Sequence, residues 1–418
     1  MKRIILFVCL IGLLLCTGCS GREAPDASAP LSPAIGQLKD KTALVRCTAK
    51  DTDLAFSRED FCALTGEQTE YIVIGTLPES GLLMLGGKAV IAGQTIPVSS
   101  LDYFKYIPEK ASEQTAEVHF TFTAKAPGWE NRELSCTVAV LESENFAPVA
   151  NDLAAETYAS VACFADLPVS DPNGDAVECR IVRYPLHGFV FLEGGKAVYR
   201  PEDGFAGEDS FVYTASDRYG NTSAECTVNI QVVENESNLC FADLADSPVH
   251  NAAISLCAEN IMTYRMQDGA YYFDPASPVS KIDCLIMMMC LTGQNEAVTA
   301  VTDTEANDDG TLSAGKKGFL QAAIAHGAVY LQEGAFDPQS DVTAADAAYM
   351  AMRLLGVPAL SAKQEFADLQ SAPAWACTAL VSADSAGILQ AMNGMLDASR
   401  VLTRADVAFL LQNMKAYQ

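Results

Sequence analysis

Three segments near the C-terminus decide the fold of that part of the chain. They read Phe273-Asp-Pro-Ala-Ser-Pro-Val-Ser-Lys-Ile-Asp283, Phe336-Asp-Pro-Gln-Ser-Asp-Val-Thr-Ala-Ala-Asp346 and Leu396-Asp-Ala-Ser-Arg-Val-Leu-Thr-Arg-Ala-Asp406. In each segment a hydroxyl residue precedes the final aspartate by three positions, which is the pattern of a capping box at a helix start. The segments recur at a spacing of about 60 residues. We therefore predict three related helices that begin after Ser280, Thr343 and Thr403.

The residues that follow these starts have the helical period. One predicted helix places on a single face Ile282, Leu285, Ile286 and Met289, and another places on a single face Val407, Leu410 and Met414. Beyond Glu236 the composition shifts to Ala, Met and Leu. The C-terminal part is therefore predicted to be an all-α domain.

The repeated segments resemble the S-layer homology (SLH) motifs of bacterial surface proteins. A further shared element is Phe241-Ala-Asp-Leu244, which recurs as Phe366-Ala-Asp-Leu369. The resemblance divides this part of the chain into SLH repeat 1 at 240–293, repeat 2 at 298–357 and repeat 3 at 364–418. Repeat 2 is degenerate, because the polar stretch that begins at Thr302 replaces its opening element. The resemblance implies that the repeats pack as one pseudo-threefold unit.

The same resemblance implies a partner, an anionic secondary cell-wall polysaccharide. In SLH proteins a basic residue at the helix start contacts pyruvylated polysaccharide, and this role falls here on Lys281 and Arg404, whereas Ala344 breaks the pattern. Free amides and the dipole at a helix start favour an anion, so we expect both cations to hold it beside these amides, and neither is predicted to be buried. A solvated surface charge is the alternative for each. Trp375 is a candidate for stacking on a sugar ring, with a core or rim position as its alternative. The candidate polysaccharide-binding residues are Ser280, Lys281, Thr403, Arg404 and Trp375.

Two segments before the helical part, 40–145 and 146–235, alternate apolar and polar residues with a period of two. Val118, Phe120 and Phe122 show the pattern in the first segment, and Cys226, Val228 and Ile230 show it in the second. Turn signals such as Glu193-Gly-Gly195 and Tyr219-Gly-Asn221 punctuate the strands. We predict half-buried antiparallel strands in two tandem all-β sandwiches.

The second sandwich resembles the cadherin-like, Ig-like repeats of bacterial surface proteins. The resemblance rests on the Asp-rich loop Asp171–Asp175, the Pro-x-His-Gly turn at Pro185–Gly188, the Tyr-x-Pro element at Tyr199–Pro201 and the Gly-x-Asp-Ser-Phe strand at Gly207–Phe211. The first sandwich keeps the turn, as Leu77-Pro-Glu-Ser-Gly81, and the Tyr-x-Pro element, as Tyr106-Ile-Pro108. It lacks the Asp-rich loop.

The Asp-rich loop is a candidate calcium site. Asp171, Asn173 and Asp175 offer alternating oxygen ligands around a glycine, as the start of a calcium loop does, and cadherin-like repeats include members that bind calcium between domains. No glutamate at the EF-hand distance completes the loop. An Asx-stabilised turn without metal is the alternative.

The N-terminus has the features of an export signal. Met1-Lys2-Arg3 precedes an apolar run that is too short to span a bilayer, so 1–19 is predicted to be a signal peptide. Cys16-Thr-Gly-Cys19 resembles a bacterial lipobox, which implies that Cys19 is lipidated and that the protein contacts the membrane through this anchor. Cys16 departs from the usual leucine, and a simply secreted protein is the alternative. The Ala-, Pro- and Ser-rich stretch 20–39 is predicted to be a flexible linker.

Eleven cysteines follow Cys19, with no CxxC pair and no zinc-like spacing. Cys47 with Cys136 and Cys179 with Cys226 are candidate disulfides, and buried free thiols are the alternative.

The net charge and the absence of catalytic motifs disfavour two classes of function, nucleic-acid binding and catalysis. The formal net charge is -26, which disfavours nucleic acid as a partner because phosphate neutralisation requires a basic face. The four histidines have no metal spacing, and HExxH and GxSxG are absent. We therefore expect a non-catalytic cell-envelope anchoring protein on the extracellular face, attached to membrane and wall. The alternative is a surface adhesin or carbohydrate-binding receptor whose sandwiches bind an external partner, with or without calcium.

Overall fold

The computed structural model describes residues 43–109, 116–129, 132–295, 298–301, 312–331, 336–363, 365–392 and 394–418. The predicted signal peptide, Cys19, the linker and the Thr302 stretch lie outside these residues. The described chain divides into two compact units. One contains the β-sandwich residues up to Glu156 together with Cys163–Val232, and the other contains Thr157–Ala162 and Val233–Gln418. None of the helices in these ranges has the length and hydropathy needed to cross a membrane.

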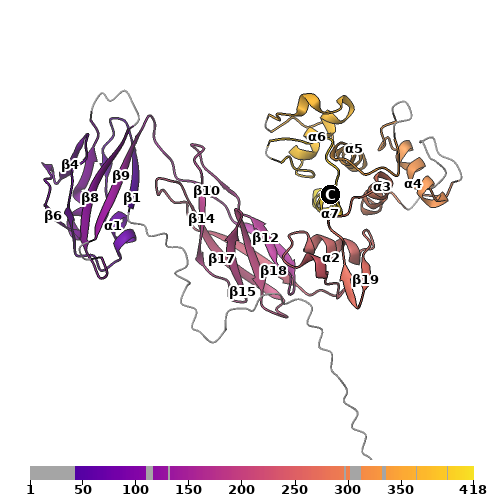
Figure 1. Cartoon of the computed structure of the whole chain (residues 1–418), viewed down its shortest axis with the longest axis horizontal. Coiled ribbons are helices and arrows are strands. Elements are labelled where there is room, and N and C mark those ends of the chain that lie inside the picture. The colour runs from indigo at the N-terminus through magenta and orange to yellow at the C-terminus, as the bar shows by residue number, and fades with distance from the viewer. Residues whose placement is uncertain are drawn as a thin grey trace, which may run out of the picture. The chain divides into compact units, whose positions relative to one another are not determined.

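The first sandwich consists of two sheets (Figure 1). The first sheet has the order β1 (Ala43–Ala49), β9 (Glu133–Leu141), β8 (Ala116–Lys125), β3 (Tyr71–Ile74) and β6 (Thr95–Pro97). The second has the order β2 (Leu54–Ala55), β7 (Phe104–Ile107), β4 (Leu82–Leu85) and β5 (Lys88–Ala89). Helix α1 (Arg58–Thr65) and the 3-10 helix η1 (Val98–Tyr103) complete the domain. Its core is aromatic, because Phe56, Phe61, Phe104, Phe120 and Phe122 are buried together.

Two features of this domain differ from the sequence prediction. Strand β1 pairs with β9 in parallel, whereas all strands were predicted to be antiparallel. The pairing joins residues about 90 positions apart, and a local period of two carries no information on strand direction. Helix α1 was not predicted. Ser57 and Asp60 form a reciprocal capping box at its start.

The second sandwich pairs a four-stranded sheet with a three-stranded sheet. The larger sheet has the order β11 (Leu153–Tyr158), β18 (Cys226–Val233), β17 (Gly207–Ser216) and β14 (Glu178–Arg183). The smaller has the order β12 (Cys163–Asp166), β16 (Lys196–Pro201) and β15 (Gly188–Glu193), and a short pair joins β10 (Val149–Ala150) to β13 (Val169–Ser170).

The turn motif has the same structural basis in both sandwiches. A Cβ atom on Gly81 would lie 2.6 Å from the ring of Tyr106, and one on Gly188 would lie 2.5 Å from the ring of Tyr199. Each tyrosine hydroxyl donates to a carbonyl of the turn, at 3.0 Å to Ser80 and 3.3 Å to the residue before Gly188. The glycine is therefore required so that the tyrosine can pack on the turn, which supports the predicted internal repeat.

The helical unit has one hydrophobic core that includes all of its helices. In chain order its elements are η2 (Ala242–Leu244), α2 (His250–Ala258), α3 (Lys281–Leu291), α4 (Ala314–Ala325), α5 (Ala344–Leu355), η3 (Leu369–Ser371), α6 (Ala374–Ser385) and α7 (Arg404–Tyr417). The expectation of an all-α domain is wrong in one detail, because the hairpin of β19 (Arg265–Gln267) and β20 (Ala270–Tyr272) follows α2. Asp268 and Gly269 form its turn with positive φ.

The predicted helix starts are confirmed, since α3, α5 and α7 begin directly after Ser280, Thr343 and Thr403. The Phe-Ala-Asp-Leu element has an equally specific role. The carboxylate of Asp243 accepts bonds from the amides of Phe273 and Asp274, at 2.9 and 2.7 Å. Asp368 accepts bonds of the same lengths from the amides of Leu396 and Asp397. In both repeats this aspartate fixes the loop that leads into the next helix start.

Candidate functional site

The starts of α3, α5 and α7 are joined in a closed ring by backbone hydrogen bonds. In α3 the amides of Lys281 and Ile282 donate to carbonyls in the loop before α5, at Ser340 and Pro338, both at 2.9 Å. In α5 the first two amides donate in the same way to the loop before α7, at 2.9 and 3.0 Å. In α7 they donate to the loop before α3, at 2.8 and 3.0 Å. The three repeats therefore close on one another with pseudo-threefold symmetry.

This ring corrects the expectation that spare amides receive the anion. Each helix start also has its third amide bonded to the hydroxyl of its cap residue, at 3.2 to 3.3 Å. Because the first three amides of each helix have partners within the protein, they do not offer a free anion site of the kind expected at a helix N-terminus. Binding of an anion at these helix starts would have to rest on side chains.

The predicted residues Ser280 and Thr403 are helix caps. The hydroxyl of Thr403 accepts from the Asp406 amide and lies 2.7 Å from the Asp406 carboxylate, which also accepts from the Thr403 amide. Ser280 makes the hydroxyl bonds, at 2.7 Å to the Asp283 carboxylate, but lacks the reciprocal amide bond. Both hydroxyls thus serve the helix start rather than an open surface.

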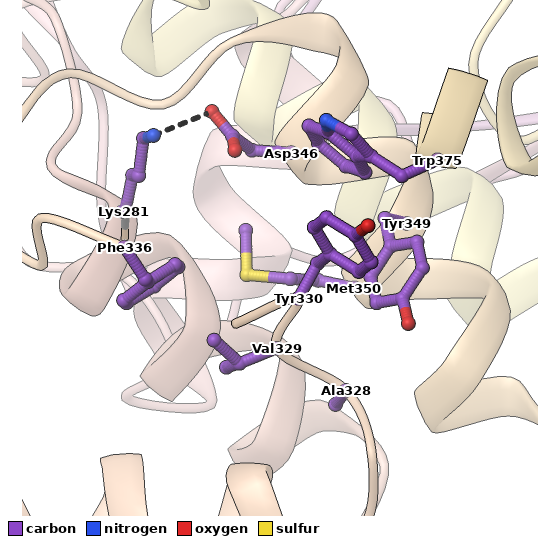
Figure 2. Close-up of a pocket in the computed structure, with 9 residues that line it drawn as sticks. All are labelled: Lys281, Ala328, Val329, Tyr330, Phe336, Asp346, Tyr349, Met350 and Trp375. Carbon is purple, nitrogen blue, oxygen red and sulfur yellow. Dashed lines mark ion pairs between the residues drawn. The ribbon is translucent and has the colours of Figure 1, made fainter. Parts of the chain in front are cut away.

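Lys281 lies at the edge of a pocket of about 100 Å³ (Figure 2). Its ammonium group is 3.1 Å from the carboxylate of Asp346, the capping acid of α5, and 5.8 Å from the centre of the Phe336 ring. The side chain of Lys281 is 15% exposed and that of Asp346 is 11% exposed. Lys281 is therefore partly buried, because the ion pair and the ring hold it on the pocket wall.

Aromatic side chains form the opposite wall of this pocket. The rings of Tyr330 and Trp375 stack with centroids 5.1 Å apart and planes 12° apart. Tyr349 meets Trp375 edge-on at 5.6 Å and Tyr330 at 5.8 Å. We predicted Trp375 from the sequence and missed Tyr330 and Tyr349. They come from the loop after α4 and from α5, so only an alignment of the repeats position by position could have placed them in one site.

Arg404 has a different environment. Its guanidinium donates to the backbone carbonyl of Phe273 at 2.7 Å and to that of Thr263, and it lies 4.7 Å from the centre of the Phe273 ring. Burial lowers the pKa of Arg404, an effect that nearby Asp274 and Asp243 oppose. Arg404 is partly buried and bonded to the main chain.

The start of α5, in the degenerate second repeat, lacks both the cation and the phenylalanine ring that meet at the other two helix starts. Ala344 replaces the cation, and Leu396 stands where Phe336 and Phe273 stand in the other repeats. Both residues are buried.

The candidate calcium loop has the geometry of an Asx turn. One carboxylate oxygen of Asp171 accepts from the amides of Asn173 and Asp175, at 2.8 and 3.0 Å. The side chain of Asn173 is also bonded, because it accepts from the Phe146 amide and donates to the Glu144 carbonyl. Asp175 lies 3.3 Å from the guanidinium of Arg218. The other Asp171 oxygen is buried without a partner. The described residues contain no cluster of three His, Cys, Asp or Glu side chains suited to a metal.

The candidate disulfides are not formed. Cys47, Cys136, Cys179 and Cys226 have free thiols. Burial raises the pKa of the Cys163 and Cys257 thiols to about 11. His250 is buried with a pKa lowered by desolvation, and its ring nitrogen accepts from the Phe241 amide.

One family model and several solved structures match part of the chain. A family model described as a bacterial Ig domain matches residues 145–231. A solved endo-fucoidan hydrolase, MfFcnA4 from glycoside hydrolase family 107, is 17% identical with a TM-score of 0.18, over 46% of this chain and 28% of that chain. Human mucin-like protocadherin EC1-2 is 12% identical with a TM-score of 0.19, over 45% of this chain and 95% of that chain. Drosophila N-cadherin EC1-3 is 14% identical with a TM-score of 0.20, over 47% of this chain and 64% of that chain.

The chain thus spans little more than a quarter of the hydrolase that it resembles, and at these TM-scores the solved structures carry no argument about activity. No curated protein sequence matches the chain significantly. Residues 145–231 are an Ig-like domain of a type that is typical of extracellular and surface proteins.

Proposed function

We propose that this protein is a non-catalytic anchoring protein of the bacterial cell envelope, and that its SLH-like helical unit binds an anionic secondary cell-wall polysaccharide. A lipid on Cys19 attaches the chain to the membrane, and the two sandwiches act as spacers between membrane and wall. The observation that carries the proposal is the Lys281 pocket, where a cation faces the aromatic cluster of Tyr330, Tyr349 and Trp375.

The pocket chemistry fits an acid-bearing sugar. Aromatic rings offer apolar faces to the C–H face of a sugar, with a polar edge at Tyr and Trp that forms hydrogen bonds. The Lys281 ammonium has three donors, of which Asp346 requires one, so the others remain for a carboxylate or phosphate of the ligand. Because the ligand must be charged to use this lysine, its affinity falls as salt concentration rises.

Sedimentation with purified sacculi tests this proposal. The full chain without its lipid should sediment with intact sacculi and remain in the supernatant when the secondary polysaccharide has been removed. Lys281→Met should reduce the bound fraction at least tenfold. Lys363→Met removes an exposed lysine of the same unit and serves as the matched control, with binding unchanged. Equal sedimentation with intact and stripped sacculi would refute the proposal.

A further inference from the structure

The ring allows its three related places to be compared position by position. In the first place the four positions are the first residue of α3, the third residue after the positive-φ Gly327 that follows α4, the sixth residue of α5 and the second residue of α6. The other two places contain the equivalent positions of the other repeats. These positions are Lys281, Tyr330, Tyr349 and Trp375 in the first place, Ala344, Gln390, Phe409 and Asn251 in the second, and Arg404, Thr263, Ile286 and Gly315 in the third.

The first place alone among these combines a cation with three aromatic rings. In the third place the positions of the tyrosines and the tryptophan are occupied by Thr263, Ile286 and Gly315. None of these side chains has a ring on which a sugar could stack. The second place has no cation at the helix start itself, although Arg400 pairs there with the capping acid Asp406 at 2.8 Å. Of its four compared positions only Phe409 carries a ring. The amide of Asn251 is engaged by main-chain partners, with bonds of 3.1 Å to Tyr158 and Ala162.

Two donors of Arg404 are bonded to the main chain of the protein itself. Its two bonds reach carbonyls on either side of the β19–β20 hairpin in the first repeat, although Arg404 begins the last helix of the third repeat. The separations along the chain are 131 and 141 residues. A partly buried guanidinium bonded in this way holds two distant segments together, and an anionic ligand that used the same donors would have to displace those bonds.

We infer that the described helical unit has a single anionic-sugar site, at Lys281, and that Arg404 instead ties the third repeat to the first and closes the ring. This inference rests on the proposed function and refines it. The resemblance to SLH repeats assigned ligand contact to both cations, whereas the geometry separates them into one binding residue and one structural residue.

Binding and stability of the full chain are measured on the same variants. Calorimetric titration with solubilised, purified secondary wall polysaccharide gives the affinity, and thermal unfolding gives the stability. Lys281→Met should raise Kd at least tenfold. Arg404→Met should lower Tm by several degrees, while Kd of the folded protein stays within twofold of wild type. Arg404→Gln is the second variant, because its amide keeps one carbonyl bond but carries no charge, and it should also bind within twofold.

The outcomes are distinct. A folded Arg404→Gln protein whose Kd rises as far as that of Lys281→Met would overturn the inference and leave the proposed function standing. Failure of the wild-type chain to bind the polysaccharide would reject the proposed function, and the inference with it. Normal binding by both Arg404 variants, with weakened binding by Lys281→Met, is the expected result.

Discussion

At the scale of single residues, the Phe-Ala-Asp-Leu element shows how one side chain shapes a loop. Asp243 accepts two backbone amides, and a charged acceptor makes each bond stronger than a neutral one. The loop that it fixes supplies Phe273, whose carbonyl and ring contact Arg404. Asp243 is therefore coupled to the closure of the ring through the loop that it fixes.

Replacement of Asp243 by alanine should destabilise the helical unit by about 3 kcal/mol, because two partly buried amide bonds lose their charged acceptor. Urea unfolding can be followed through Trp375 fluorescence in a Trp129→Phe background, since the chain has two tryptophans. Glu236→Ala, at an exposed acid, should change the unfolding free energy by less than about 0.5 kcal/mol. A similarly small change for Asp243→Ala would contradict the assigned role.

At the scale of elements, the start of α7 couples stability to pH. Burial alone would raise the pKa of Asp406, but bonds from the Thr403 hydroxyl and amide and from Arg400 outweigh burial and lower that pKa below its usual value. A group with a lowered folded-state pKa stabilises the fold above its unfolded pKa of about 4 and loses that contribution as pH falls through the folded value.

Asp406→Asn should therefore be less stable than wild type at pH 7, by about 1 kcal/mol, and the difference should shrink by pH 2. Urea midpoints at the two pH values provide the measurement. A stability difference that stays constant or grows on acidification would mean that the folded protein does not stabilise the ionised form of Asp406.

The elements that could be predicted from sequence are those with local signals. The hydroxyl and acid of each capping box lie three residues apart, so the starts of α3, α5 and α7 were visible in the sequence. The parallel pairing of β1 with β9 and the ring of amide bonds depend on residues far apart in the chain, and no local period encodes them. Only part of the site could be predicted for the same reason, because Lys281 belongs to a sequence motif, whereas Tyr330 and Tyr349 belong to none.

At the scale of the whole molecule, Cys163 and Cys257 are buried, and their thiols, with pKa values raised to about 11, are poorly nucleophilic at neutral pH. The candidate disulfides Cys47–Cys136 and Cys179–Cys226 are not formed, so a reducing agent should leave Tm unchanged. In the native protein Cys163 and Cys257 should react slowly with iodoacetamide. A fall of several degrees in Tm with dithiothreitol would show that the protein depends on disulfides.

The central claim concerns one pocket, and Trp375 lies in it. In the Trp129→Phe background, Trp375 is the sole tryptophan, so its fluorescence reports on the pocket directly. Titration of the full chain with solubilised anionic wall polysaccharide should change this fluorescence saturably, and Lys281→Met should abolish the change at the same concentrations. Polysaccharide binding with no response from Trp375, or an equal response in Lys281→Met, would contradict the account.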